Sequence, residues 1–255
     1  NLKLTDGQVT IVDPNTFTVV NQLPVGLGPT NIEFANQKGY VTNSSSKSFS
    51  VINLSSLTTE TSFVFPDGFR PNNVSFSSLK NKLYFYNTTN TDLKVVNAND
   101  FNDSHIVPSG STTRPTDFEI SPDGRFLYIL GTNSSKMSLF DVESETSTIL
   151  DYGYQYLTDG VMGASHYYVA YYRGTGGNNI GGVLKIDIST NTIVGHLEWE
   201  YQVDQLKLTA AEELIYAVTP IDSTVQVIET SSMHRITSTK VDGNLKYLAV
   251  TKNNY

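Results

Sequence analysis

The sequence predicts an all-β fold, a six-bladed β-propeller whose blades have four strands each. Three observations lead to this expectation. The composition is rich in Tyr (15) and Phe (12) but only 16% charged. A strand-and-turn pattern returns about every 42 residues along the whole chain. Finally, the two ends of the chain carry complementary parts of one repeat, so that they would complete a blade together.

The composition of the 255 residues favours strands and excludes several classes of function. Aromatic and β-branched side chains suit a pleated sheet, and 38% hydrophobic residues suffice for a core of thin elements. A formal net charge of -8 argues against a nucleic-acid partner or an anionic membrane surface. No run of about 18 apolar residues occurs, so we expect no membrane insertion. The absence of cysteine excludes disulfides and thiolate chemistry.

The most regular element of the repeat is a strand that ends in an acid or an amide and is followed by a turn. Examples are SFSVINLSS at 48–56, KMSLFDVES at 136–144 and GVLKIDIST at 182–190. Short acid and amide side chains suit this place because they can bond the backbone of the following turn. The terminal positions are 40 to 46 residues apart: Asp13, Asn53, Asn97, Asp141, Asp187 and Glu229.

Three further strands accompany this one in each unit. The strand before it contains a tyrosine, as in KGYVTN at 38–43, and an earlier strand reads as in NIEFA at 31–35. A last strand follows the turn, as in NTIVGHL at 191–197. The tyrosine lies eleven residues before the apolar centre of the next strand in four units, at Tyr40, Tyr84, Tyr128 and Tyr216.

Four strands in about 42 residues are typical of a propeller blade. We expect one propeller domain over 1–255, with blades 2 to 6 at 29–69, 70–113, 114–155, 156–202 and 203–243. Blade 1 would combine 1–28 with 244–255, so that N-terminal strands pair with a C-terminal strand. Such a closure hides the strand edges that otherwise invite aggregation.

Several of these segments resemble a known family of repeats. YVTN at 40–43, GPTNIEF at 28–34 and RPTDFEISPDGRFLYIL at 114–130 are similar to the YVTN-type propeller repeat, which occurs in YncE-like proteins and archaeal surface-layer propellers. The resemblance implies an extracytoplasmic propeller, periplasmic, cell-surface or secreted, whose signal or anchor is not in this chain. Propellers of that family are often non-enzymatic, and the resemblance supplies no catalytic residues.

The fifth unit departs from the repeat and is therefore the best place to seek a function. Its loop between the second and third strands, RGTGGNNIGG at 173–182, is longer than its counterparts and follows several tyrosines. Aromatic rings and forked arginine donors suit sugars, carboxylates and protein segments. The alternative is structural, with tyrosines packed between blades and arginines bonded to a neighbouring blade. The candidate ligand-binding rim comprises Arg70, Arg114, Tyr154, Tyr156, Tyr172, Arg173, Trp199 and Tyr201.

Polar residues also recur in register at the start of the first strands. We expect them to ring the mouth of the channel, where they would hold water or a cation. The alternative is that they satisfy amides of the segments between blades. This polar ring comprises Asn31, Asn73, Asp117, Asp159 and Gln205.

Motifs for catalysis and metal binding do not occur in the sequence. None of the four histidines has a partner at metal-ligand spacing. Neither GxSxG nor HExxH occurs, and GTGGNNIGG lacks the Lys-Ser/Thr of a phosphate loop. We therefore predict no catalytic residues, no metal site and no cofactor.

The function that the sequence favours is binding of a protein or glycan partner through the loop faces of a non-catalytic, extracytoplasmic propeller. One alternative is a propeller that binds a small molecule or a chelate. Another is a lyase-type or hydrolase-type enzyme with its site at the channel mouth, near Arg70, Arg114, Tyr156 and Arg173.

Overall fold

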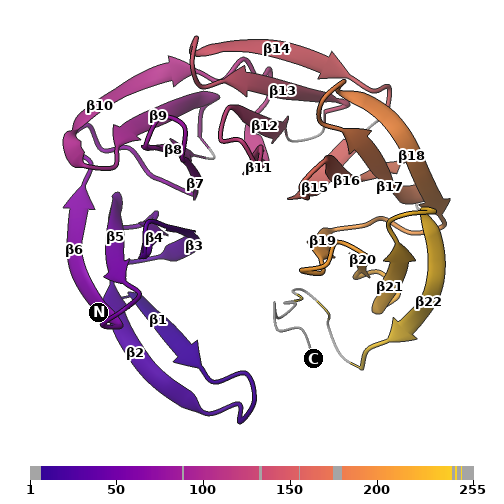
Figure 1. The fold of residues 1–255 in the computed structure, drawn as a ribbon, viewed down its shortest axis with the longest axis horizontal. Helices are drawn as coiled ribbons and strands as arrows, with labels where there is room; N and C mark the ends of the chain where they lie inside the picture. The colour runs from indigo at the N-terminus through magenta and orange to yellow at the C-terminus, as the bar shows by residue number, and fades with distance from the viewer. Residues whose placement is uncertain are drawn as a thin grey trace. The chain divides into compact units, whose positions relative to one another are not determined.

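The computed structural model describes residues 7–87, 89–131, 134–154, 156–174 and 180–242, together with Leu245 and Leu248. Every regular element in this part of the chain is a β-strand, which confirms the predicted all-β class (Figure 1). No helix in it is long and apolar enough to cross a membrane. The chain divides into two compact units, Asn1–Pro108 (unit 1) and Ser109–Tyr255 (unit 2), which are described in turn.

Unit 1 contains a two-stranded sheet and two four-stranded sheets, all antiparallel. The two-stranded sheet consists of β1 (Gly7–Val12) and β2 (Val19–Val25). Blade 2 comprises β3 (Pro29–Ala35), β4 (Lys38–Asn43), β5 (Ser48–Asn53) and β6 (Thr58–Val64). Blade 3 comprises β7 (Asn73–Ser77), β8 (Lys82–Tyr86), β9 (Asp92–Asn97) and β10 (Asp100–Pro108).

Unit 2 contains three four-stranded sheets, each antiparallel and in sequence order. Blade 4 comprises β11 (Pro115–Ile120), β12 (Phe126–Gly131), β13 (Lys136–Asp141) and β14 (Thr146–Asp151). Blade 5 comprises β15 (Tyr156–Met162), β16 (His166–Arg173), β17 (Ile180–Asp187) and β18 (Thr192–Trp199). Blade 6 comprises β19 (Gln205–Leu208), β20 (Leu214–Thr219), β21 (Thr224–Glu229) and β22 (His234–Lys240).

The tyrosine spacing seen in the sequence is a cross-strand pairing. Tyr40 lies opposite Val51, Tyr128 opposite Leu139, and the same pairing joins the second and third strands of blades 3 and 6. A tyrosine and an apolar residue opposite each other on antiparallel strands stabilise the sheet through side-chain packing. The repeat period therefore fixes the strand register as well as the strand positions.

The predicted closure of blade 1 depends on residues 1–6 and 244–255, nearly all of which lie outside the described residues. In the described part of the chain, β1 pairs with β2 alone, and no sheet is closed by strands from both ends. Closure of blade 1 by strands from both ends of the chain remains a prediction.

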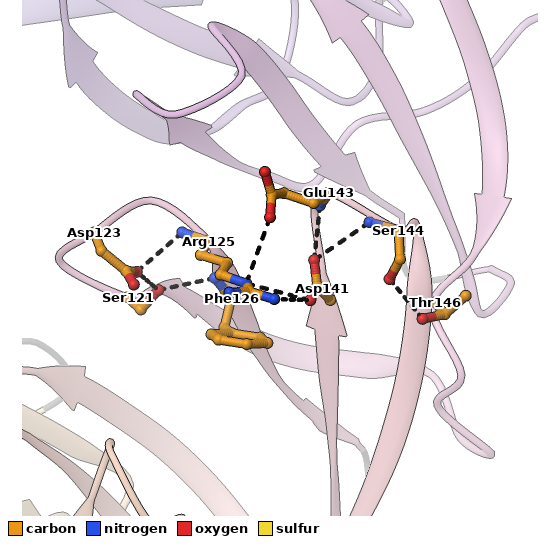
Figure 2. Close-up of polar contacts among 8 residues, drawn as sticks. All are labelled: Ser121, Asp123, Arg125, Phe126, Asp141, Glu143, Ser144 and Thr146. Atoms are coloured by element: carbon orange, nitrogen blue, oxygen red, sulfur yellow. Dashed lines mark hydrogen bonds and ion pairs between the residues drawn. The ribbon is translucent and has the colours of Figure 1, made fainter.

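A turn stabilised by the predicted acid or amide follows the third strand of the sheets, as Figure 2 shows for blade 4. Asp141 accepts hydrogen bonds from the backbone N–H groups of Glu143 (2.8 Å) and Ser144 (3.3 Å). The Ser144 and Thr146 hydroxyl oxygens lie 2.7 Å apart, which is hydrogen-bonding distance. These are the turn bonds expected of Asp and Asn. The equivalent bonds are made by Asp13, Asn53, Asn97 and Asp187.

The core lies between adjacent sheets within each unit. In unit 1 the fully buried Phe49 ring lies between blades 2 and 3, with ring centroids 5.1 Å from Phe85 and 4.9 Å from Phe101. In unit 2 the rings of Tyr128 and Tyr167 pack at 5.1 Å between blades 4 and 5. Such aromatic packing holds neighbouring blades together and leaves their loops available for binding.

Candidate functional site

Blade 5 brings together most of the residues of the predicted rim. Strand register places Tyr156, Tyr172, Gly181 and Trp199 in one row across its four strands. Six of the eight rim residues lie on this blade or directly beside it: Tyr154, Tyr156, Tyr172, Arg173, Trp199 and Tyr201. The aromatic cluster therefore follows from residues of a single repeat.

Two glycines on β17 make the arrangement of this end of blade 5 possible. A Cβ at Gly182 would lie 2.7 Å from the Tyr171 ring and 2.3 Å from the Leu197 carbonyl oxygen. With no side chain there, the Tyr171 ring covers the strand and reaches β18, where its hydroxyl donates to Glu198 Oε2 at 3.1 Å. An aromatic ring over a strand glycine restores the packing that the glycine lacks.

Glu198 is the polar centre of this end of the blade. Besides the Tyr171 hydroxyl it accepts from Arg173, whose Nη2 lies 2.9 Å from Oε1 and 2.8 Å from Oε2. Burial, followed by the bond to Glu198, raises the pKa of Tyr171 well above its usual value, so the phenol stays a donor. The Arg173 side chain is half exposed, so the ion pair orients the two groups more than it stabilises the fold.

The tyrosines of the rim pack on neighbouring rings of the same blade. Tyr154 contacts the Tyr171 ring edge-on at 4.4 Å, and the Tyr156 ring lies 4.7 Å from that of Tyr172. Tyr154, Tyr156 and Tyr172 all keep part of their surface accessible. They therefore pack as structural residues do and still present exposed edges to a ligand, so the binding interpretation and the packing interpretation of the sequence both apply.

Trp199 and Tyr201 lie where β18 ends and the chain turns toward blade 6. A Cβ at Gly181 would lie 2.0 Å from the Tyr201 carbonyl oxygen, so this glycine lets the returning backbone close over β17. The Tyr201 side chain is 39% exposed. Trp199 Nε1 is buried and has no hydrogen-bond partner among the described residues. Such a donor in a pocket wall calls for an explanation.

A pocket of about 460 Å³ opens between the end of blade 5 and the outer strands of blade 6. A smaller cavity of about 210 Å³ shares Glu198, Trp199 and Arg235 with it. The larger one is lined by Glu198, Trp199, Glu200, Tyr201, Asp222, Thr224, Gln226, Arg235 and Ser238. Of the lining residues, sequence reasoning identified Trp199 and Tyr201, and the rim residues Tyr154, Tyr156, Tyr172 and Arg173 do not line this pocket. The polar wall comes from blade 6, whose residues follow the ordinary repeat and give no signal of their own.

The two remaining rim residues belong to other blades. Arg70 is exposed in unit 1, where it lines a pocket of about 380 Å³ together with Asp67, Asn87 and Ile106. Arg114 is exposed and directly precedes β11 in unit 2. The tip of the long blade 5 loop, at 175–179, lies outside the described residues.

The polar ring residues of unit 2 bond neighbouring first strands to each other. Asp117 on β11 accepts from the Gly160 N–H on β15 at 3.1 Å, and Asp159 on β15 accepts from the Leu206 N–H on β19 at 2.6 Å. Gln205 makes the next bond of the series, accepting from the Leu248 N–H at 2.7 Å. The side chains at these three positions thus do what the structural alternative expects, which is to satisfy backbone amides.

In unit 1 the ring positions make local contacts instead. Asn73 accepts from the N–H of its neighbour Val74 at 2.8 Å, and the Asn31 N–H donates to the Thr42 hydroxyl at 3.0 Å. A bond between first strands also occurs in unit 1, but from another position: Glu33 on β3 accepts from the Phe76 N–H on β7 at 3.3 Å.

The two aspartates of the ring have an unusual electrostatic environment. Burial raises the pKa of Asp117, and burial together with the nearby Asp117 charge raises that of Asp159, while Lys207 and the backbone N–H donors oppose both shifts. Across the described residues, no group of three or more His, Asp or Glu side chains gathers as a metal site would require.

Comparison with known proteins identifies the fold. No family model matches the chain, and no curated protein matches it. Among solved structures, Kuenenia stuttgartiensis hydrazine synthase matches with a TM-score of 0.70 and 16% identity, over 88% of this chain and 71% of that chain. The β-propeller domain of Myceliophteria thermophila Cps50 (Swd1) matches with a TM-score of 0.74 and 10% identity, over 94% and 81% of the two chains. At such identities a likeness shows the fold alone: the chain has the β-propeller fold.

Proposed function

We propose that this chain is a non-catalytic, extracytoplasmic β-propeller of the YVTN-type repeat family that binds a protein or glycan partner through the blade 5 end of unit 2. The observation that carries the proposal is the placement of Arg173, Glu198, Trp199 and Tyr201 beside a pocket of about 460 Å³. Pockets that bind ligands in proteins are mostly of this size, about 300–1,000 Å³.

The physical character of this end supports a binding role. The tyrosine rings of blade 5 pack on one another, and the Tyr171 ring also covers Gly182, so these rings need little ordering when a partner arrives. Arg173 presents a forked donor that Glu198 already orients. The cellular location rests on the resemblance of the repeats and on a surface rich in uncharged polar residues.

A second candidate, a propeller that binds a small molecule, is favoured by the pocket of unit 1. The exposed Arg70 guanidinium lines it beside the amides Asn87 and Asn90. A guanidinium beside amide donors suits a small carboxylate or a chelate with carboxylate groups.

The proposal is tested by binding of the purified chain to a glycan array and to a panel of small carboxylates, with the Tyr156→Ala, Arg173→Ala double variant in parallel. Binding lost in the double variant at unchanged thermal stability supports the blade 5 site. Arg125→Ala is the matched control, because it breaks another ion pair of unit 2, Arg125–Asp141 at 3.0 Å, which joins the turn before β12 to the end of β13 (Figure 2). Ligands that bind the wild type and the double variant equally well would contradict the proposal.

A further inference from the structure

The pocket between blades 5 and 6 has two walls of different chemistry. Blade 5 supplies the Trp199 and Tyr201 rings, and blade 6 supplies mainly polar side chains. A ring with an apolar body and a polar tip offers a flat contact surface at small entropic cost. An apolar ligand would leave the polar wall without partners, whereas a ligand with only charged groups would not use the rings.

The polar wall is ordered by its own hydrogen bonds. The Thr224 hydroxyl lies 3.0 Å from both carboxylate oxygens of Asp222, and Gln226 Nε2 donates to Thr224 Oγ1 at 2.7 Å. Arg235 Nη1 approaches Gln226 Oε1 at 3.4 Å. Gln226 is nearly fully buried, at 3% exposed, which fixes its amide. An ionised carboxylate has about four acceptor positions, so Asp222 keeps capacity for further donors.

The charges of the pocket indicate the charge of its ligand. Glu198 is already paired with Arg173, which leaves the carboxylates Glu200 and Asp222 against the single guanidinium of Arg235. The balance is negative, as is that of the whole chain at -8. Carboxylates repel an anionic ligand, and desolvating one here would leave its charge poorly paired.

We infer that this pocket binds a neutral sugar residue, with one face of the pyranose ring against Trp199 and Tyr201 and its hydroxyls donating to Asp222 and accepting from Gln226 and Arg235. This rests on the proposed function and names its ligand class. A pyranose is the ligand that uses both walls at once, because its C–H face is apolar and its edge carries hydroxyl donors and acceptors. The volume of about 460 Å³ lies in the range of small-ligand sites.

The chain provides its own probe for the test. Trp199 is its single tryptophan and lines both this pocket and the smaller cavity beside it, so selective excitation of tryptophan fluorescence reports this end of blade 5. Tyr201 and Asp222 line only the larger pocket, so variants at these positions distinguish the two. The wild type is titrated with the methyl glycosides of glucose, galactose, mannose and N-acetylglucosamine, with glucuronate as the anionic arm and glycerol as the control for viscosity and refraction. We expect a saturable change with at least one neutral glycoside and none with glycerol.

Two variants and a matched control locate the effect. Asp222→Asn removes a charged acceptor and should weaken the glycoside about tenfold or more. Tyr201→Ala removes one ring, and folding should tolerate it because the side chain is exposed and the backbone carbonyl is what covers Gly181. Glu229→Gln makes the same kind of charge change at the other end of β21 and should leave affinity unchanged. Thermal unfolding of each variant checks that it is folded.

The outcomes separate this inference from the proposed function. Saturable binding of a neutral glycoside, weakened by Asp222→Asn and Tyr201→Ala but not by Glu229→Gln, supports it. Binding of glucuronate alone, or glycoside binding that both pocket variants leave intact, overturns it. If no glycoside changes Trp199 fluorescence while a ligand from the other panels still depends on Tyr156 and Arg173, the sugar assignment fails and the proposed function stands.

Discussion

The carboxyl groups of Asp117 and Asp159 should make the stability of the chain depend on pH. Burial raises the pKa of Asp117 to about 6, and burial together with the Asp117 charge raises that of Asp159 to about 7, from an ordinary value of 3.8. Folding therefore favours the protonated forms. The stabilisation is fully present below about pH 4 and is lost as the pH rises through about 6 to 7, where the native carboxyls ionise. At neutral pH the ionised carboxylates therefore lower the free energy of unfolding.

The size of the effect follows from the shift. One pKa unit corresponds to about 1.4 kcal/mol, so the Asp159 shift sets an upper limit of about 4 kcal/mol. Both side chains keep part of their surface accessible and Lys207 lies near them, which reduces the limit. In Asp159→Asn the amide oxygen still accepts from the Leu206 N–H, and the charge is gone. We expect this variant to raise the free energy of unfolding by about 1–2 kcal/mol at about pH 8 and by almost nothing at about pH 4.

The assay is denaturant unfolding of wild type and Asp159→Asn across this pH range, followed by far-UV circular dichroism. Asp117→Asn serves as the partner variant, because removing that charge should lower the pH at which the remaining dependence occurs. A variant that destabilises equally at both ends of the range would refute the reasoning. It would mean that Asp159 is ionised in the native state and stabilised there by its backbone donors.

Three further predictions concern packing and turns. Gly160→Ala should cost about 2 kcal/mol or more, because its Cβ would lie 2.0 Å from the hydroxyl oxygen and 2.4 Å from Cζ of the buried Tyr167 side chain. In a Tyr167→Leu background, which removes the hydroxyl and the far end of the ring, the added cost should fall in the same unfolding assay, and an unchanged cost would contradict this contact. Phe49→Ala should cost about 3–5 kcal/mol, since the ring is fully buried between two blades, and a loss below about 1 kcal/mol by thermal unfolding would contradict it. Glu145→Asn should stabilise by up to about 1 kcal/mol, because Glu145 has a φ of 55° where Asn is better tolerated; a lower midpoint in urea would count against this explanation.

Much of the fold could be predicted because each repeat uses the same turn bonds and the same cross-strand pairs. Asp141 and Asn53 recur at the end of the third strand since the turn that follows needs a short acceptor, and the structure places their bonds there. Tyr40 and Tyr128 recur at a fixed distance from an apolar residue because the two lie opposite each other on adjacent strands. Closure depends on the chain ends and stays a prediction.

The candidate site could be predicted only in part. Tyr156 and Arg173 were found because blade 5 departs from the repeat within one continuous stretch of sequence. Asp222 and Arg235 were missed because they belong to an ordinary repeat and gain their role only from the neighbouring blade. Glu198 was missed for a related reason: its partner Tyr171 reaches it over Gly182, and a contact that depends on one missing side chain gives no periodic signal in the sequence.

The bonds between first strands have a consequence for how such a chain can change over evolutionary time. In each of them the side chain belongs to the earlier repeat and the donor is a backbone N–H of the later one, 43 to 47 residues on. Every residue except proline carries that donor, so the later repeat needs no particular side chain at the receiving position. A duplicated repeat would carry its own side-chain acceptor, and the repeat that follows it would supply a backbone N–H donor. Copies can thus diverge widely, or change in number, while the seam between them stays the same.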